Sequence, residues 1–167
     1  LALGTFGLGV TEYVMMGILP FMAADFGVSI AEAGHLISSY ALGVCVGAPL
    51  MGAFMRTWRL KTIVATLMCI YIGASVGMAL CPEYYSMMAM RFVAGLPHGA
   101  YFGVGSIIAD RMARGGKSAT AVAIMCSGMT VANLVGIPFG TFVCQVASWR
   151  YIFAFSALWG VVTLLCI

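Results

Sequence analysis

The chain has 167 residues, of which 63% are hydrophobic and only 8% are charged. A water-soluble domain carries roughly a quarter charged residues, so much of this apolar surface must face lipid. A bilayer core roughly 30 Å thick needs about 20 apolar residues of helix to cross it, which leaves room for about six crossings and none for a soluble domain. The net charge of +3 does not indicate nucleic-acid binding, because membrane topology already explains the cations, which lie mostly in short loops.

Apolar stretches of helical length follow one another along the chain, and short polar or proline-containing segments separate them. Ser29 or Ser38 is placed to cap the second helix, and Cys81-Pro82-Glu83 separates the third from the fourth. We therefore expect an all-α polytopic membrane protein. Its membrane-spanning helices are predicted over residues 1–22, 33–55, 61–81, 84–109, 118–144 and 150–167.

Glycine and proline interrupt the predicted helices at related places. Gly47-Ala48-Pro49 lies late in the second span and Gly136-Ile137-Pro138 late in the fifth, on helices that run in opposite directions. Such interruptions are typical of inverted-repeat transporters. We therefore predict one six-helix bundle over 1–167, with 1–81 and 82–167 as two three-helix repeats. The alternative is coincidence, because Gly and Pro are frequent in membrane helices.

The charges predict how the bundle lies in the membrane. Six of the eight cations fall in the second and fourth gaps between spans, which face the same side: Arg56, Arg59, Lys61, Arg111, Arg114 and Lys117. Positively charged loops stay in the cytoplasm, so the N-terminus is expected inside. Four other charged residues are expected on or near the outer face: Asp25, Glu32, Glu83 and Arg150.

Three ionisable residues lie within predicted spans. Glu12 is about ten residues, roughly 15 Å, from the outer end of the first span, and Arg91 is roughly 12 Å deep in the fourth. These depths are compatible with a pair. His98 follows Arg91 by seven positions, on nearly the same helical face, and Gly95 between them keeps that face open. A buried carboxylate costs several kcal/mol, which favours a functional reason for it.

Two interpretations of these residues stay open. In the functional one, Glu12 gains and loses a proton while Arg91 or His98 biases its proton affinity. In the other, a permanent buried ion pair sets helix register and does no chemistry. Arg91 can also extend toward water, and His98 can be a packing histidine bonded to a neighbouring carbonyl or hydroxyl.

Other polar and small residues in the spans have either a cavity role or a packing role. Hydrogen-bonding groups that would line a solute cavity, or else hold helices together, are Tyr13, Tyr40, Tyr101 and Asn133. Gly128, Ala132 and Gly136 form a small-residue seam along the fifth span, and Pro138 permits a bend there. The six cysteines lie singly without metal-binding spacing, so we interpret them as packing residues and expect no metal.

Several motifs together resemble the major facilitator superfamily. Arg91-x-x-x-Gly95-x-Pro97-His98-Gly99-Ala100 and Gly128-x-x-x-Ala132-x-x-x-Gly136-x-Pro138-x-Gly140 are similar to its fourth- and fifth-helix motifs, and Trp149-Arg150-x-x-Phe153 accompanies them. Gly9-x-Thr11-Glu12-Tyr13-Val14 and the run from Tyr40 to Pro49 resemble, more narrowly, the bacterial arabinose-efflux-permease-like branch of the drug:proton antiporters. The resemblance covers essentially the whole chain.

This resemblance implies roles for individual residues. It implies that Arg91 takes part in proton coupling, that the fifth-helix motif from Gly128 to Gly140 is associated with antiport, and that the first and fourth helices line a central cavity. The loop after the second helix departs from the family pattern. Gly52 and Lys61 match that pattern and Arg59 keeps the loop basic, but Arg56 replaces an acidic residue. The usual charge relay of that loop is therefore in doubt.

Taken together, these features predict the N-terminal six-helix half of a bacterial inner-membrane transporter. The chain begins at Leu1 without a methionine and stops at Ile167 inside an apolar run, so we expect a missing C-terminal half. The expected activity is export of a small organic solute, drug or sugar in exchange for protons, with Glu12 as proton carrier and no cofactor. The alternatives are a uniporter or sugar importer, a non-transporting sensor, and an intramembrane enzyme, although no nucleophile accompanies Glu12 and His98.

Overall fold

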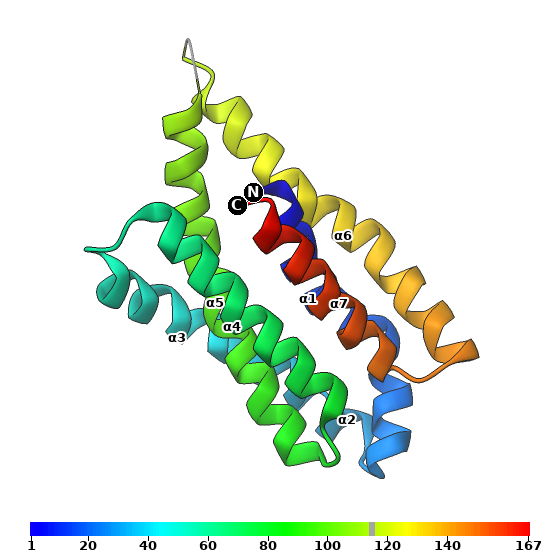
Figure 1. Ribbon diagram of the computed structural model, residues 1–167. Helices are drawn as coiled ribbons and strands as arrows, with labels where there is room; N and C mark the ends of the chain where they lie inside the picture. The colour runs from blue at the N-terminus through cyan, green and yellow to red at the C-terminus, as the bar shows by residue number, and fades with distance from the viewer. Residues whose placement is uncertain (114–115) are drawn as a thin grey trace.

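A computed structural model of the chain describes residues 1–113 and 116–167, and all regular secondary structure in these ranges is helical. The all-α fold predicted from composition is confirmed. Figure 1 shows the helices as an elongated bundle. They are α1 (Ala2–Phe26), α2 (Ile30–Ala33), α3 (His35–Met55), α4 (Leu60–Leu80), α5 (Tyr84–Met112), α6 (Ser118–Val146) and α7 (Arg150–Leu165).

The helices correspond to the predicted spans with shifted ends. α1 continues one turn beyond the predicted end, and the second span consists of the short α2 followed by α3. Five spans are long and apolar enough to cross a membrane, whereas α7 has only 16 residues and is shorter. The chain is therefore a multi-pass membrane protein.

The connection between α1 and α2 shows why the first span ends where it does. Gly27 has a φ of 65°, in the left-handed region that favours glycine, and it ends α1. Ser29 then caps α2: its hydroxyl accepts a hydrogen bond from the Glu32 amide, and the Glu32 carboxylate accepts one from the Ser29 amide. Of the two predicted capping serines it is thus Ser29 that caps, while Ser38 lies inside α3.

The prolines do not break the helices. Pro20, Pro49, Pro97 and Pro138 lie inside α1, α3, α5 and α6, each of which is a continuous helix. The interruptions that the sequence suggested are therefore not breaks in the described chain. The division into repeats over 1–81 and 82–167 stays a prediction.

Packing pairs helices from the first part of the chain with helices from the second. α1 packs mainly against α6, α3 against α5, and α4 against both α5 and α7. In Figure 1 the yellow α6 and the red α7 accordingly lie along the blue α1. These pairings bring side chains of α1, α3 and α5 together in the middle of the bundle, which is where the candidate site lies.

Two helices keep broad apolar faces uncovered. In an 18-residue apolar stretch of each span, only 22% of the residues are buried in the second span and 22% in α6, compared with 56% in α1. Large apolar side chains are exposed on both helices; they include Leu42, Val46 and Phe54 of α3, and Leu134, Val135 and Phe142 of α6. Apolar surface of this extent fits a lipid bilayer or another membrane-embedded partner rather than water.

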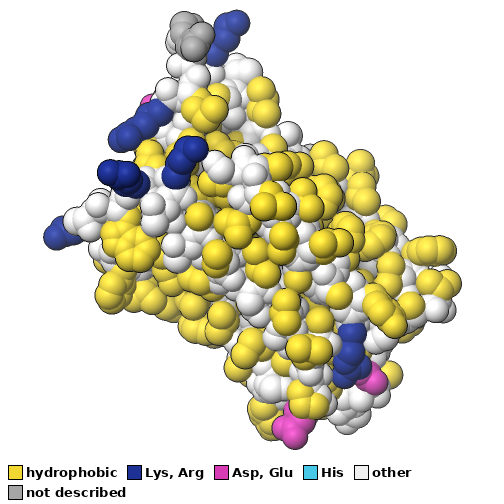
Figure 2. Space-filling view, viewed as in Figure 1, with side chains coloured by type: hydrophobic (Ala, Val, Ile, Leu, Met, Phe, Trp, Pro, Cys, Tyr) yellow, Lys and Arg dark blue, Asp and Glu magenta, His cyan; other side chains and the backbone are white. Residues whose placement is uncertain are grey.

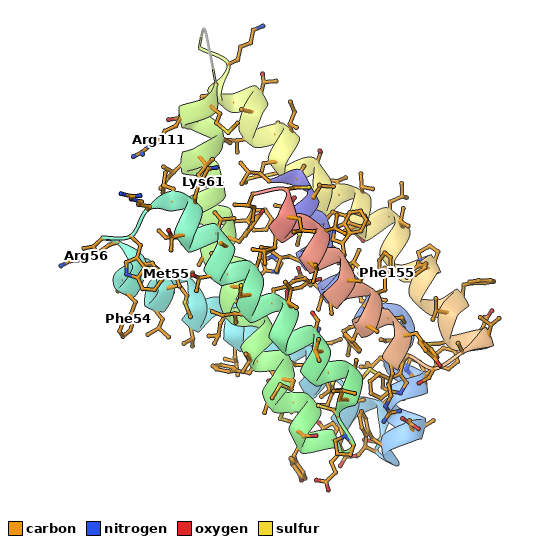
Figure 3. The ribbon with its side chains drawn as sticks, viewed as in Figure 1. Phe54, Met55, Arg56, Lys61, Arg111 and Phe155 are labelled. Atoms are coloured by element: carbon orange, nitrogen blue, oxygen red, sulfur yellow. The ribbon has the colours of Figure 1, made fainter. Side chains whose placement is uncertain are left out.

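Charged side chains gather at the two ends of the bundle. Figure 2 shows lysine and arginine mostly at one end and acidic side chains mostly at the other. Arg56, Lys61 and Arg111 lie at the same end in Figure 3, although Arg56 follows α3, Lys61 belongs to α4 and Arg111 to α5. At the opposite end Asp25, Glu32 and Glu83 line one shallow pocket. Arg114, predicted in the basic group, lies outside the described residues.

Candidate functional site

Arg91 of α5 is completely buried, and its guanidinium contacts two other helices. Its Nη1 donates a hydrogen bond of 2.8 Å to the Thr11 carbonyl in α1, and its Nε donates one of 3.2 Å to the Leu36 carbonyl in α3. The guanidinium carbon lies 4.3 Å from the centre of the Tyr40 ring. The positive charge is thus held by main-chain carbonyls and an aromatic face.

The ion pair between Arg91 and Glu12 that the sequence suggested is not formed. Among the described residues, the ion pairs within 4 Å are His98 with Glu12 and Arg150 with Asp25. The other sequence-based alternative for Arg91, extension toward water, is also wrong, because its exposed fraction is 0%. Its Nη2 has no hydrogen-bond partner among the described residues. Arg91 therefore places a largely unneutralised charge in the centre of the bundle.

His98, not Arg91, is the basic side chain closest to Glu12, and the two form an ion pair only when the imidazole is protonated. The distance from His98 Nε2 to the Glu12 carboxylate oxygen Oε2 is 3.8 Å. This is longer than a hydrogen bond, so the contact is electrostatic. The His98 side chain is 8% exposed and the Glu12 side chain 37% exposed, but the Oε2 atom that faces His98 is buried and has no hydrogen-bond partner among the described residues.

The second ring nitrogen of His98 is also engaged. The Tyr40 hydroxyl lies 2.6 Å from Nδ1, and the imidazole stacks on Phe102 with ring centres 5.3 Å apart. Glu12, His98, Tyr40 and Arg91 thus form a continuous polar chain across α1, α5 and α3. Such a chain can hold or release a proton at Glu12 or His98.

Gly95 is essential to the proximity of α3 and α5. A Cβ atom at Gly95 would collide with the Tyr40 carbonyl and lie 2.9 Å from the Val44 amide nitrogen. The sequence suggested that Gly95 keeps one face of the helix open. In the structure that face is instead filled by the α3 backbone, which brings Tyr40 within reach of both Arg91 and His98.

The predicted small-residue seam of α6 lies against α1. The residues of α6 that are buried include Gly128, Ala132, Gly136 and Gly140, spaced one turn apart. The closest approach is at Gly128, where a Cβ atom would collide with the Ala2 carbonyl. At Gly136 the nearest atom would be 3.8 Å away, an ordinary contact. Pro138 is exposed on the same helix.

The other predicted cavity residues are scattered. Tyr13 is half-buried and adjacent to Glu12, whereas Asn133 is exposed on α6. Tyr101 is completely buried, and its hydroxyl donates a hydrogen bond of 3.2 Å to the Leu1 carbonyl. Tyr101 therefore packs α5 against the start of α1, and its role in a solute cavity stays a prediction.

The predicted loop residues lie together at the basic end. Arg56 and Arg59 are exposed between α3 and α4, Lys61 is exposed in the first turn of α4, and Gly52 is exposed in the last turn of α3. None of the three cations forms an ion pair among the described residues. The Lys61 ammonium instead donates a hydrogen bond of 3.2 Å to the Ile167 carbonyl.

Sequence reasoning missed two members of the buried network. The Thr11 hydroxyl lies 2.9 Å from the Tyr71 hydroxyl, which in turn donates a hydrogen bond of 2.8 Å to the Gly7 carbonyl. This pair joins α1 to α4 directly beside the carbonyl that holds Arg91. A tyrosine in the middle of an apolar span, rather than at its end, was the available signal, because a buried hydroxyl needs a partner.

Comparison with known proteins identifies one family and several similar transport proteins. Residues 1–167 match the family model described as Major Facilitator Superfamily. AraJ of Escherichia coli K12, described as a candidate transporter, is 47% identical over 96% of this chain and 41% of its own length. The inner membrane transport protein YdhP of the same strain is 42% identical over 98% of this chain and 42% of its own length.

A chloramphenicol resistance protein of Streptomyces lividans is also similar, with 31% identity over 92% of this chain and 39% of its own length. The chain thus spans between 39% and 42% of the length of these three relatives.

Proposed function

Because this chain belongs to the Major Facilitator Superfamily, we propose that it is part of a secondary active transporter that exports a small organic solute in exchange for protons. Membership places the chain among membrane transport proteins rather than enzymes. Export is supported by the similarity to a chloramphenicol resistance protein. Coupling to protons is our own inference from the buried polar residues.

The observation that carries this proposal is the contact between Glu12 and His98, 3.8 Å apart on two helices of a largely apolar bundle. A carboxylate at membrane depth is costly when it is charged and unpaired. Taking up a proton removes that charge and changes which conformation is favoured. Protons and solute are coupled if each stabilises a different conformation of the transporter.

Arg91 fits this scheme as a fixed charge. Its hydrogen bond to the Thr11 carbonyl places the guanidinium next to the residue that precedes Glu12. A fixed positive charge favours the ionised carboxylate. In our proposal, Arg91 therefore opposes protonation of Glu12. A rearrangement of the helices that moves Arg91 away from Glu12 then makes protonation more favourable.

The surroundings of the transporter are also part of the proposal. The relatives are more than twice as long as this chain, so we propose that a second helical half supplies the opposite wall of the solute cavity. The uncovered faces of α3 and α6 are available for that half or for lipid. The basic end would face the cytoplasm of a bacterial inner membrane, with the N-terminus inside.

Transport by the full-length protein in proteoliposomes tests this proposal. Chloramphenicol and arabinose serve as labelled probes, and an imposed pH gradient supplies the driving force. Glu12→Gln keeps the shape of the side chain but cannot ionise, so gradient-driven flux should be lost while the protein still folds. Glu83→Gln, at an exposed acidic residue outside the bundle centre, is the matched control and should transport normally.

Two results would contradict the proposal. Unchanged gradient-driven flux in Glu12→Gln would remove Glu12 from the coupling mechanism. Probe movement by the unmodified protein that ignores the pH gradient would instead identify a facilitator, which moves solute downhill only.

A further inference from the structure

The direction of the hydrogen bond between Tyr40 and His98 depends on which ring nitrogen of His98 carries the hydrogen. The Tyr40 hydroxyl lies 2.6 Å from Nδ1 of His98, and Nε2 on the other side of the ring lies 3.8 Å from the Glu12 carboxylate. Tyr40 is 2% exposed and His98 7% exposed, so neither side chain has free access to water. Each nitrogen of this imidazole therefore faces one specific partner.

The chemistry of the two partners selects one tautomer. A neutral imidazole carries one N–H donor and one acceptor nitrogen, whereas an ionised carboxylate can only accept. Nε2, which faces the carboxylate, should carry the hydrogen. Nδ1 is then the acceptor, and the Tyr40 hydroxyl donates to it.

The opposite tautomer leaves the Tyr40 hydroxyl hydrogen unpaired and places two sites of negative charge density face to face. Nε2 would turn a lone pair toward the Glu12 carboxylate, and Nδ1–H would donate to the Tyr40 oxygen. The hydroxyl hydrogen of Tyr40 would then lack an acceptor, because within residues 1–113 and 116–167 its hydroxyl has no other hydrogen-bond partner than Nδ1. Leaving buried polar groups unpaired destabilises that arrangement.

We propose that Tyr40 is a positioning residue that holds the imidazole of His98 in its Nε2–H tautomer and turns Nε2 toward Glu12. The functional importance of this tautomer rests on the proposed function, because proton exchange between His98 and Glu12 requires a defined N–H directed toward Glu12. The tautomer itself depends only on the local contacts. Tyr40 thereby gains a role distinct from lining a solute cavity.

Tyr40 is itself held in place from both sides. The Arg91 guanidinium lies over the Tyr40 ring at 4.3 Å, and the main-chain carbonyl of Tyr40 lies against Gly95. His98 is restrained in turn, because its ring stacks on Phe102 at an angle of 18°. The charged groups around this contact are Glu12 from α1 and Arg91 from α5. The geometry is therefore set by three helices rather than by a flexible side chain.

The ¹⁵N chemical shifts of histidine measure the tautomer directly. The full-length protein is labelled with ¹⁵N-histidine and studied in detergent at alkaline pH, where the imidazole is neutral. The His98 signal is the one that disappears in His98→Gln. We expect a single dominant Nε2–H form in the unmodified protein, and in Tyr40→Phe a fall of about fivefold in the ratio of the two tautomers, the factor expected for loss of one hydrogen bond.

Tyr101→Phe is the matched control, because Tyr101 is also a buried tyrosine but donates its hydrogen bond to the Leu1 carbonyl. It should leave the His98 signal unchanged. An unaltered tautomer ratio in Tyr40→Phe would overturn the inference. A mixture of tautomers, or an Nδ1–H form, in the unmodified protein would overturn it without any variant.

This experiment separates the two proposals, because the tautomer is measured without a proton gradient or a solute. If Glu12→Gln transports normally, the proposed function fails while the tautomer result stands. If the tautomer does not depend on Tyr40, the positioning role fails while Glu12 can still be the proton carrier.

Discussion

Arg91 in α5 is joined to Thr11 in α1 by a hydrogen bond of 2.8 Å from its Nη1 to the main-chain carbonyl. Because Glu12 is the next residue after Thr11, this bond fixes the segment of α1 that carries the candidate proton carrier. The same guanidinium also binds the Leu36 carbonyl and stacks on Tyr40. One buried cation thus sets the relative positions of α1, α3 and α5.

Replacing Arg91 with lysine should destabilise the protein even though the charge is kept. Lysine lacks the planar fork that reaches two carbonyls while stacking on a ring. Loss of one hydrogen bond from a charged group corresponds to about 1.5–3 kcal/mol of unfolding free energy. Thermal unfolding in detergent measures the loss. Arg111→Lys, at an exposed position on the same helix, should change little, and equal effects of the two variants would contradict the role of Arg91.

Gly95→Ala tests the close approach of α5 to α3. The added methyl group would meet the Tyr40 carbonyl, and overpacking of this kind destabilises by about 1–3 kcal/mol. Gly103→Ala is the control on the same helix, because a Cβ there meets nothing within 4 Å. It should be neutral or slightly stabilising. Equal unfolding temperatures for the two variants would argue that α3 and α5 have room to spare.

The α1–α6 interface predicts different tolerances along one seam. Gly128→Ala should destabilise by about 1–3 kcal/mol, since its methyl group would collide with the Ala2 carbonyl. Gly136→Ala should be tolerated, because the nearest atom to its Cβ would be 3.8 Å away. Thermal unfolding of both variants decides the matter. A larger loss at Gly136 than at Gly128 would show that the helices approach most closely elsewhere.

The ion pair at the acidic end should contribute much less to stability than the contacts of Arg91. Arg150 Nη1 lies 3.0 Å from Asp25 Oδ2, but the two side chains are 38% and 45% exposed. Exposed ion pairs contribute about 0–1 kcal/mol, and the amide oxygen of Asn can still accept the Trp149 indole hydrogen bond. Asp25→Asn should therefore lower the unfolding free energy by under about 1 kcal/mol. High salt should shrink the difference, so a large, salt-independent loss would contradict this view.

The level of agreement between sequence and structure differs between features. Helix number and approximate extent followed from apolar length, because a bilayer imposes that length on each span. The family followed from the spacing of Gly, Pro and Arg in motifs, and the match over residues 1–167 confirms it. The predicted positions of the helix ends were less accurate, since these ends depend on local features such as the left-handed conformation of Gly27 and the Ser29 cap.

The candidate site was found in part. Glu12, Arg91 and His98 were conspicuous because ionisable groups are rare at membrane depth, and helical rise placed Glu12 and Arg91 at compatible depths. Depth, however, says nothing of rotation about the helix axis. His98 therefore lies nearest to Glu12, while Arg91 binds main-chain carbonyls that no side-chain pattern can reveal. The proton-coupling roles of all three stay predictions.

What the sequence alone determined is the class of molecule: a bundle of membrane-spanning helices with most of its cations at one end and costly charges within. These features arise from interactions with the membrane, which act on each helix separately. Only the tertiary structure decided that Tyr40 contacts His98 and that Gly95 and Gly128 lie where a Cβ atom would collide with the backbone of a neighbouring helix. Such contacts depend on how neighbouring helices are rotated and how closely they approach, and those quantities are set jointly by residues far apart in the chain.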